Sequence, residues 1–171
     1  YAAQGVRYVT CLDSLFTMPK RRLVALCDAL IARQIDIRWI CYARADDLTD
    51  LETVALMKRA GCHQVQIGIE SGSQQQLDHM NKRCTVDANR KALANCRAAG
   101  VTSLVTVIVG FPGETAETLE ATARFLEEAG PDFYYAAPFN TRVEEVPILS
   151  PESRQRFGLV TVGGTRSSAP Y

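Results

Sequence analysis

The sequence contains no long apolar run, no excess of charge of either sign and no closely spaced cysteines. None of its apolar stretches reaches the roughly 18–20 residues of a membrane-spanning helix, and its amino terminus lacks the charged and apolar regions of a secretory signal. Nineteen Lys and Arg balance nineteen Asp and Glu, which disfavours a broad charged surface for nucleic acid or an anionic membrane. We therefore expect no nucleic-acid partner, no membrane partner and a cytoplasmic location.

The cysteines are too far apart in sequence to form a local metal or redox site. Six are present, and no two lie closer than 12 positions, so the C-x-x-C spacing is absent. Several fall within strand or helix patterns, where a free cysteine usually acts as a small buried apolar side chain. We therefore expect no metal ligands among them. The six are Cys11, Cys27, Cys41, Cys62, Cys84 and Cys96.

The apolar pattern predicts a repeated alternation of strand and helix. Expected strands lie at 6–11, 37–42, 64–69, 104–109 and 132–137, with helices starting at Pro19, at a Thr49–Glu52 capping box, near Val86 and near Ala116. Three helices end in Ala-Gly shortly before a strand, which indicates one repeated unit. Right-handed crossovers then give a parallel sheet of about five strands, in the α/β class. The pattern alone fits either a doubly wound sheet or an arc of a barrel.

The domain organisation follows from composition. At 171 residues the chain has the size of one globular domain, which we place at residues 1–149. From about residue 150 the chain is rich in Ser, Gly, Pro and Arg and has no apolar rhythm. We expect residues 150–171 to be a linker or a disordered tail.

The loops that follow the strands hold the residues suited to chemistry. In both architectures, ligands bind at the carboxyl ends of the strands. Glu70 follows an apolar strand, and its carboxylate could accept bonds from hydroxyl or ammonium donors, or simply interact with a helix start. Gly72 lies between Ser71 and Ser73 in a turn that would suit a ribose, carboxylate or phosphate. No phosphate-binding P-loop and no G-x-G-x-x-G motif is present.

The segment Gly110-Phe111-Pro112-Gly113 is the second candidate loop. Its flanking glycines allow the main chain to approach a flat ligand, while Phe111 offers a packing face and Pro112 rigidity. An ordinary turn between strand and helix is the alternative interpretation.

Taken in order, four segments resemble the radical S-adenosylmethionine (SAM) enzymes, in particular the subgroup with a cobalamin-binding domain. They are LDSLFT at 12–17, RWICYARAD at 38–46, AGCHQVQIGIESGSQQQLDHMNK at 60–82 and IVGFPGETAET at 108–118. The resemblance covers roughly residues 6–140. It implies a partial (β/α) TIM-like barrel without its first βα unit.

The resemblance also implies a SAM site. Asp13 would lie beside SAM, with Ser14 where the family often has a second acidic residue, and Arg44 near SAM or substrate. Glu70 and Ser71 match the motif near the ribose and amino-acid portion of SAM. Ile108, Gly110 and Gly113 match the motif near adenine.

One family feature does not appear in this sequence: the C-x-x-x-C-x-x-C motif that binds a [4Fe–4S] cluster. The resemblance places that motif and a cobalamin domain before Tyr1, so the expected parent has an amino-terminal segment that this chain lacks. We expect the parent to be a cobalamin-dependent methyltransferase or a related radical enzyme acting on an undetermined small molecule or peptide. This chain alone would be inactive, and its catalytic residues cannot be assigned.

Two other functions fit the residues. One is a cluster-free TIM-barrel-like lyase with Glu70 or Asp13 as general base, although no lysine or histidine stands at a strand end to assist. The other is a non-catalytic binding module. In each case the first strand has an unpaired outer edge, so we expect dimerisation or aggregation through residues 6–11.

Overall fold

The computed structural model of the chain describes residues 4–140 and 147–159. The chain divides after Pro138 into two compact units, Tyr1–Pro138 and Phe139–Tyr171. The predicted boundary at residue 149 is therefore later than the observed one.

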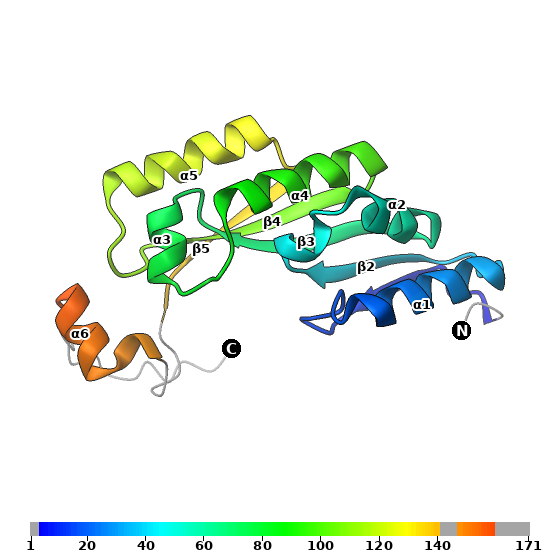
Figure 1. The fold of residues 1–171 in the computed structure, drawn as a ribbon, viewed down its shortest axis with the longest axis horizontal. Coiled ribbons are helices and arrows are strands. Elements are labelled where there is room, and N and C mark those ends of the chain that lie inside the picture. Colours follow the sequence, from blue (N-terminus) through cyan, green and yellow to red (C-terminus); the bar gives the residue numbers. More distant parts are fainter. Residues whose placement is uncertain (1–3, 141–146, 160–171) are drawn as a thin grey trace. The chain divides into compact units, whose positions relative to one another are not determined.

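Five strands form the sheet of the first unit (Figure 1). They are β1 (Tyr8–Cys11), β2 (Arg38–Ala43), β3 (Cys62–Glu70), β4 (Thr102–Val109) and β5 (Phe133–Pro138). Each strand pairs in parallel with the next along the chain, in the order β1-β2-β3-β4-β5. The prediction of a sequential parallel sheet is confirmed.

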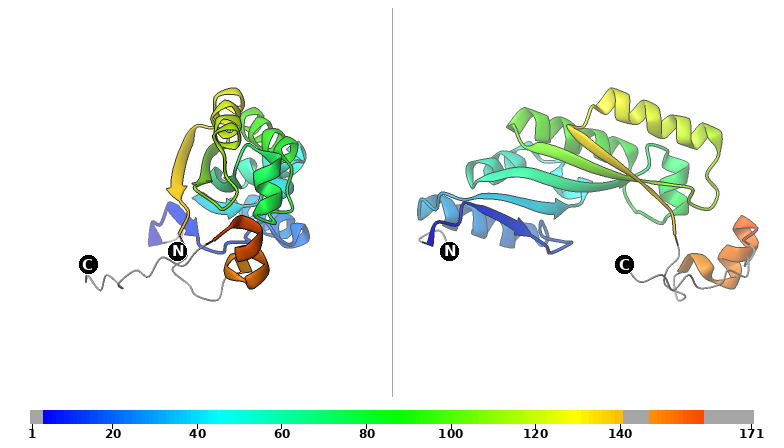
Figure 2. Two further views of the ribbon diagram at one scale, coloured as in Figure 1. Left: turned by 90° about the vertical axis from the view of Figure 1, so that its left-hand side faces the viewer. Right: turned by 180° about the vertical axis from the view of Figure 1, so that it is seen from behind.

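The helices form a single layer, and this decides between the two architectures that the pattern left open. They are α1 (Lys20–Ala32), the 3-10 helix η2 (Ala45–Leu48), α2 (Leu51–Arg59), α3 (Gln74–His79), α4 (Val86–Ala99) and α5 (Ala116–Ala129). Neighbours contact one another in the series α1 to α2, α2 to α4 and α4 to α5. A doubly wound sheet would carry helices on both faces, whereas Figure 2 shows them on one. The unit is therefore an open arc of a β/α barrel.

Strand alternation separates a dry face from a partly open one. On β3, Val65, Ile67 and Ile69 are fully buried under the helices, while the residues between them are half-buried on the opposite face. Trp39 of β2 lies in the same core, and its indole N–H donates to the Ala60 carbonyl at 2.8 Å. This core holds the strands in fixed positions against the helices, so the residues at the carboxyl ends of the strands are also held in place.

The helix starts follow their capping residues. Helix α5 has the predicted bounds because Thr115 caps it reciprocally with Thr118 and Gly130 ends it with a left-handed backbone. The predicted capping box at Thr49 is wrong, because Asp50 caps α2 through a bond from the Glu52 amide. Thr49 instead donates to the Asp46 carbonyl.

The second unit contains a short 3-10 helix, Pro147–Leu149, and the helix α6, Pro151–Phe157. Ser150 caps α6, a proline occupies its first turn and Gly158 ends it, which is a complete set of helix signals. This helix was not expected within the linker or disordered tail predicted for residues 150–171, of which residues 160–171 lie outside the described part. In the described ranges, no helix has the length and apolar character needed to cross a bilayer.

Candidate functional site

The loops at the carboxyl ends of the strands form one rim of the sheet. Asp13 follows β1, Arg44 follows β2, Glu70 ends β3 and Gly110 follows β4. Because the strands are parallel neighbours, these four positions lie along the same edge. The structure therefore places the main predicted site residues at the end of the sheet where the strands finish, and α3 lies at this end as well (Figure 1).

Glu70 has an unusual backbone conformation. Its φ angle is +65°, and the Ser71 amide bonds back to the Ile69 carbonyl at 2.9 Å, which makes Glu70 the centre of a γ-turn. The pairing with β4 shifts register between Gly68 and Glu70. A left-handed backbone at a residue other than glycine costs on the order of 1–3 kcal/mol, and such residues concentrate at functional sites.

A half-buried ion pair fixes the Glu70 side chain. Lys82 Nζ lies 2.7 Å from Glu70 Oε1, and the exposed fractions of the two side chains are 25% and 19%. The pair lies directly above Gly68, because a Cβ atom there would come within 2.6 Å of Glu70 Oε1 and 3.2 Å of Lys82 Nζ. The other carboxylate oxygen, Oε2, has no hydrogen-bond partner among the described residues. Glu70 thus has one oxygen held by the protein and one available as an acceptor.

Sequence reasoning did not identify Lys82 as a site residue. It found no lysine or histidine at a strand end, yet the fold brings Lys82 to the end of β3 from the connection between α3 and α4. The motif that carried the resemblance does include Lys82 as its last letter. The presence of Lys82 in that segment could therefore have identified it as a candidate site residue.

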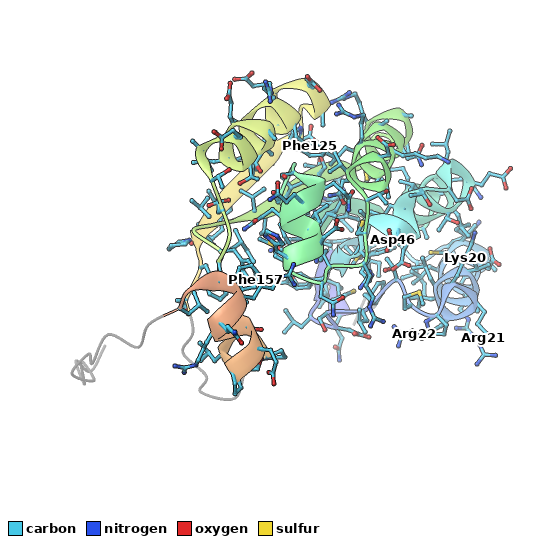
Figure 3. The ribbon with its side chains drawn as sticks, turned by 60° about the vertical axis from the view of Figure 1, so that its left-hand side comes forward. Lys20, Arg21, Arg22, Asp46, Phe125 and Phe157 are labelled. Atoms are coloured by element: carbon cyan, nitrogen blue, oxygen red, sulfur yellow. The ribbon has the colours of Figure 1, made fainter. Side chains whose placement is uncertain are left out.

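Ser71 follows Glu70 at the rim, but its side chain is turned into the protein. Its side chain is fully buried, and its hydroxyl is 2.9 Å from Thr122 Oγ1 of α5. The same threonine oxygen accepts the Gly72 amide at 3.0 Å. A Cβ atom on Gly72 would lie 2.4 Å from Cβ of Phe125, the buried α5 residue marked in Figure 3. The hydroxyl predicted to lie near SAM is thus bonded within the protein, to a residue of α5.

Ser73 is also buried, at the start of α3. Its amide donates to the hydroxyl of Ser71 at 3.1 Å, and its carbonyl accepts from the Leu77 amide at 3.0 Å. Ser71 and Ser73 therefore stabilise the loop that presents Glu70.

The loop after β4 is open where adenine was expected. Gly110 has a φ angle of +80°, and a Cβ atom there would meet nothing within 4 Å. Its amide donates to a carboxylate oxygen of Glu114, and the Phe111 carbonyl accepts from Gln76 Nε2 at 3.1 Å. Pro112 and Gly113 complete the turn, with Gly113 at a φ of +83°, while Ile108 lies half-buried on the face without helices.

Asp13 and Arg44 are each neutralised by a neighbour. Asp13 accepts from the Leu15 amide at 2.9 Å and from Arg22 at 3.0 Å. The amide bond, with a further contribution from Arg22, lowers the pKa of Asp13 below its ordinary value. Arg44 pairs with Asp46 at 3.0 Å. The residue after Asp13, Ser14, is exposed.

Figure 3 marks Arg22 and Asp46 on the side of the molecule where α1 and η2 lie. A ligand that binds near Asp13 or Arg44 would therefore meet side chains that already form ion pairs with Arg22 and Asp46.

The thiols do not form a metal site in the described part of the chain. No group of three Cys, His, Asp or Glu side chains there converges as metal ligands. Burial raises the pKa of the Cys27 thiol to about 11 and that of Cys96 to about 12. Five of the six cysteines belong to the core between sheet and helices, and the sixth, Cys11, packs against it. These residues do not fit an iron–sulfur cluster.

The fold is a one-layered β/α arc with a carboxylate and an open glycine loop at its carboxyl rim, which is the edge where half-barrels of this kind place their loops. The chain belongs to the radical SAM superfamily, whose family model matches residues 1–126. The resemblance drawn from four sequence segments is thereby confirmed.

Two curated relatives cover most of this chain. It is 32% identical over 150 residues to an uncharacterised methyltransferase of Pyrococcus horikoshii, with 85% of this chain and 32% of the relative aligned. It is 31% identical over 177 residues to the anaerobic magnesium-protoporphyrin IX monomethyl ester cyclase of Rubrivivax gelatinosus, with 91% of this chain and 32% of the relative aligned. The chain thus spans about a third of the length of these enzymes.

Solved structures show the same fold. The radical SAM methyltransferase TsrM from Kitasatospora setae, with cobalamin and a [4Fe-4S] cluster bound, superposes with a TM-score of 0.73 at 22% identity, covering 80% of this chain and 26% of TsrM. The cobalamin-dependent enzyme OxsB, with aqua-cobalamin and SAM bound, gives a TM-score of 0.65 at 26% identity, covering 71% of this chain and 19% of OxsB. OxsB is thus a cobalamin-dependent radical enzyme, and TsrM was solved with cobalamin bound.

Proposed function

We propose that this chain is the SAM-binding portion of a radical SAM enzyme. In this proposal the free oxygen of Glu70 accepts a hydrogen bond from the ligand's ribose, and the Gly110–Gly113 loop lies against its adenine. The observation that carries the proposal is the strained, ion-paired Glu70, whose Oε2 remains available at the rim.

The roles of the remaining rim residues differ. Open space above Gly110 leaves room for a flat group to approach the main chain. Phe111 and Ile108 supply nearby apolar surface, and Asp13 and Arg44 lie further along the edge as polar contacts. Ser71 and Ser73 act through the loop that they hold. Bound SAM would supply an activated sulfonium group bearing methyl and 5′-deoxyadenosyl substituents.

Iron–sulfur chemistry is not assigned to the described residues, because they offer no converging ligands. We propose that the complete enzyme binds its cluster through other residues and that this chain alone is inactive. We further propose that the complete enzyme is a cobalamin-dependent methyltransferase or a related radical enzyme acting on a small molecule or peptide. The similarity to a methyltransferase, a cyclase and two enzymes solved with cobalamin bound supports this proposal.

The test of SAM binding is a titration of the 171-residue chain, monitored by NMR so that millimolar dissociation constants are measurable. We expect weak SAM binding, because a few charge-assisted bonds must offset an association cost of several kcal/mol. Glu70→Gln should weaken binding about tenfold. Glu127→Gln, at an exposed position of α5, is the matched control.

Three results would contradict the proposal. Equal SAM affinity for the wild type and Glu70→Gln would remove Glu70 from the site and favour a non-catalytic binding module with another ligand. Proton exchange on a carbon acid that requires Glu70 but not SAM would favour the lyase. A stoichiometric four-iron cluster after anaerobic reconstitution would show that this chain itself holds the cluster, and 5′-deoxyadenosine above a control without protein would show that the chain alone is active.

A further inference from the structure

Helix α3 and the connection that follows it to α4 contact three of the rim loops. We call residues 74–85 the strap. From it, Gln76 Nε2 donates to the Phe111 carbonyl at 3.1 Å and Lys82 Nζ to Glu70 Oε1 at 2.7 Å. Cys84 Sγ donates to a carboxylate oxygen of Asp46 at 3.1 Å. The strap therefore reaches the loops after β2, β3 and β4 through one side chain each.

The backbone of the strap presents Lys82 in a defined way. Asn81 and Arg83, on either side of it, both have a φ angle of +52°, which residues other than glycine rarely adopt. The Lys82 amide bonds to the Leu77 carbonyl at 2.9 Å and closes the turn after α3. The ion pair then lies over Gly68, where an added Cβ atom would lie 2.6 Å from Glu70 Oε1 and would push the carboxylate from its observed position. The two positive φ angles, the backbone bond to Leu77 and the glycine beneath the pair thus all favour the contact between Lys82 and Glu70.

We propose that Lys82 is a positioning residue for ligand binding. It holds Oε1 of Glu70 so that Oε2 faces the ribose hydroxyls of an adenosine-containing ligand. This inference rests on the proposed function, since it concerns the same site. Lys82 itself does not touch the ligand in this assignment.

A purely stabilising role accounts poorly for these features. Partly exposed ion pairs contribute little to stability, because solvent screens them and both side chains lose freedom. Here, however, the strand carries a glycine beneath the pair and the strap carries two left-handed residues around Lys82. Orientation of a carboxylate needs such rigid support, because a small misplacement of a binding group weakens its contact.

The experiment compares adenosine with 2′,3′-dideoxyadenosine as probes, using the full 171-residue chain and NMR titration. The wild type should bind adenosine more tightly, because only adenosine carries the two ribose hydroxyls. Lys82→Met keeps the length of the side chain and removes its charge, and it should reduce this preference about tenfold. Its affinity for dideoxyadenosine and its thermal midpoint should stay unchanged. Lys82→Arg should restore most of the preference.

Lys91→Met is the matched control, because Lys91 is an exposed lysine of the adjoining helix α4. An unchanged preference in Lys82→Met would overturn the inference while leaving the proposed function standing. Equal losses for both probes, or no rescue by arginine, would show that Lys82 acts on the fold and would also overturn it. If the wild type binds neither SAM nor adenosine, the proposed function fails and the inference fails with it.

Discussion

The strained backbone at Glu70 predicts an unusual order of stability between two substitutions at that position. Glu70→Ala and Glu70→Gly both remove the carboxylate and both leave Lys82 without its partner. They differ in how well the new residue tolerates a φ angle of +65° and in how much conformational entropy it loses on folding. In an ordinary strand alanine is the more stabilising of the two, whereas here glycine should be.

The size of the difference follows from two opposing contributions. A left-handed backbone costs alanine about 1–2 kcal/mol. Glycine avoids this cost but loses about 0.5–1 kcal/mol more conformational entropy on folding. Glu70→Gly should therefore exceed Glu70→Ala in unfolding free energy by about 1 kcal/mol. For a chain of this size that corresponds to roughly 3 °C in thermal midpoint.

Urea denaturation and thermal melting of the two variants measure this difference directly. The control is the same pair of substitutions at Gln66, a half-buried β3 residue whose backbone is not left-handed. There the order should reverse, with alanine the more stable variant. If Glu70→Ala equals or exceeds Glu70→Gly in stability, the turn at Glu70 is not strained, and strain cannot support its assignment as a site residue.

Three further outcomes are expected elsewhere in the fold. Thr122→Val removes the acceptor of the Gly72 amide and one of the two partners of the buried Ser71 hydroxyl, and it should lower the unfolding free energy by about 1–3 kcal/mol in urea, whereas Thr122→Ser should lose less. The pKa of Asp132 is lowered from 3.8, chiefly by the Ser103 amide, so its contribution is present above that pH and is lost as the pH falls below it. Asp132→Asn should therefore flatten the acid side of a stability-against-pH curve, and an unchanged curve would contradict the assignment. Burial raises the pKa of the Cys96 thiol to about 12, so iodoacetamide at pH 8 should label it only after denaturation, as mass spectrometry can determine.

The order and type of the strands and the longer helices were predictable because each has a strong local signal. Helix α5 has its predicted bounds because Thr115 and Gly130 mark both of its ends within the local sequence. The start of α2 was misplaced by the competition between adjacent capping residues, Thr49 and Asp50. Which of the two is the N-cap depends on the residue at which the backbone becomes helical, and the spacing of residue types in the sequence does not specify that residue.

The site was only partly predictable, because its key contacts join distant residues. The strand pattern correctly leads to Glu70 at a rim, since apolar alternation along β3 ends there. The orientation of Ser71 depends on Thr122, which lies 51 positions away, and on a shift of register before Glu70. Lys82 reaches Glu70 through a loop with two left-handed residues, a conformation that no periodic pattern encodes.

The single layer of helices has a consequence for how the domain comes apart. Each βα unit packs mainly on the units immediately before and after it, so the energetics resemble those of a linear repeat array. The central strand β3 has neighbours on both sides, whereas β1 and β5 pair on one side only among the described residues. Opening should begin at the two edges and reach β3 last. The residue that we assign to the ligand, Glu70, therefore lies at the end of the strand that native-state fluctuations disturb least.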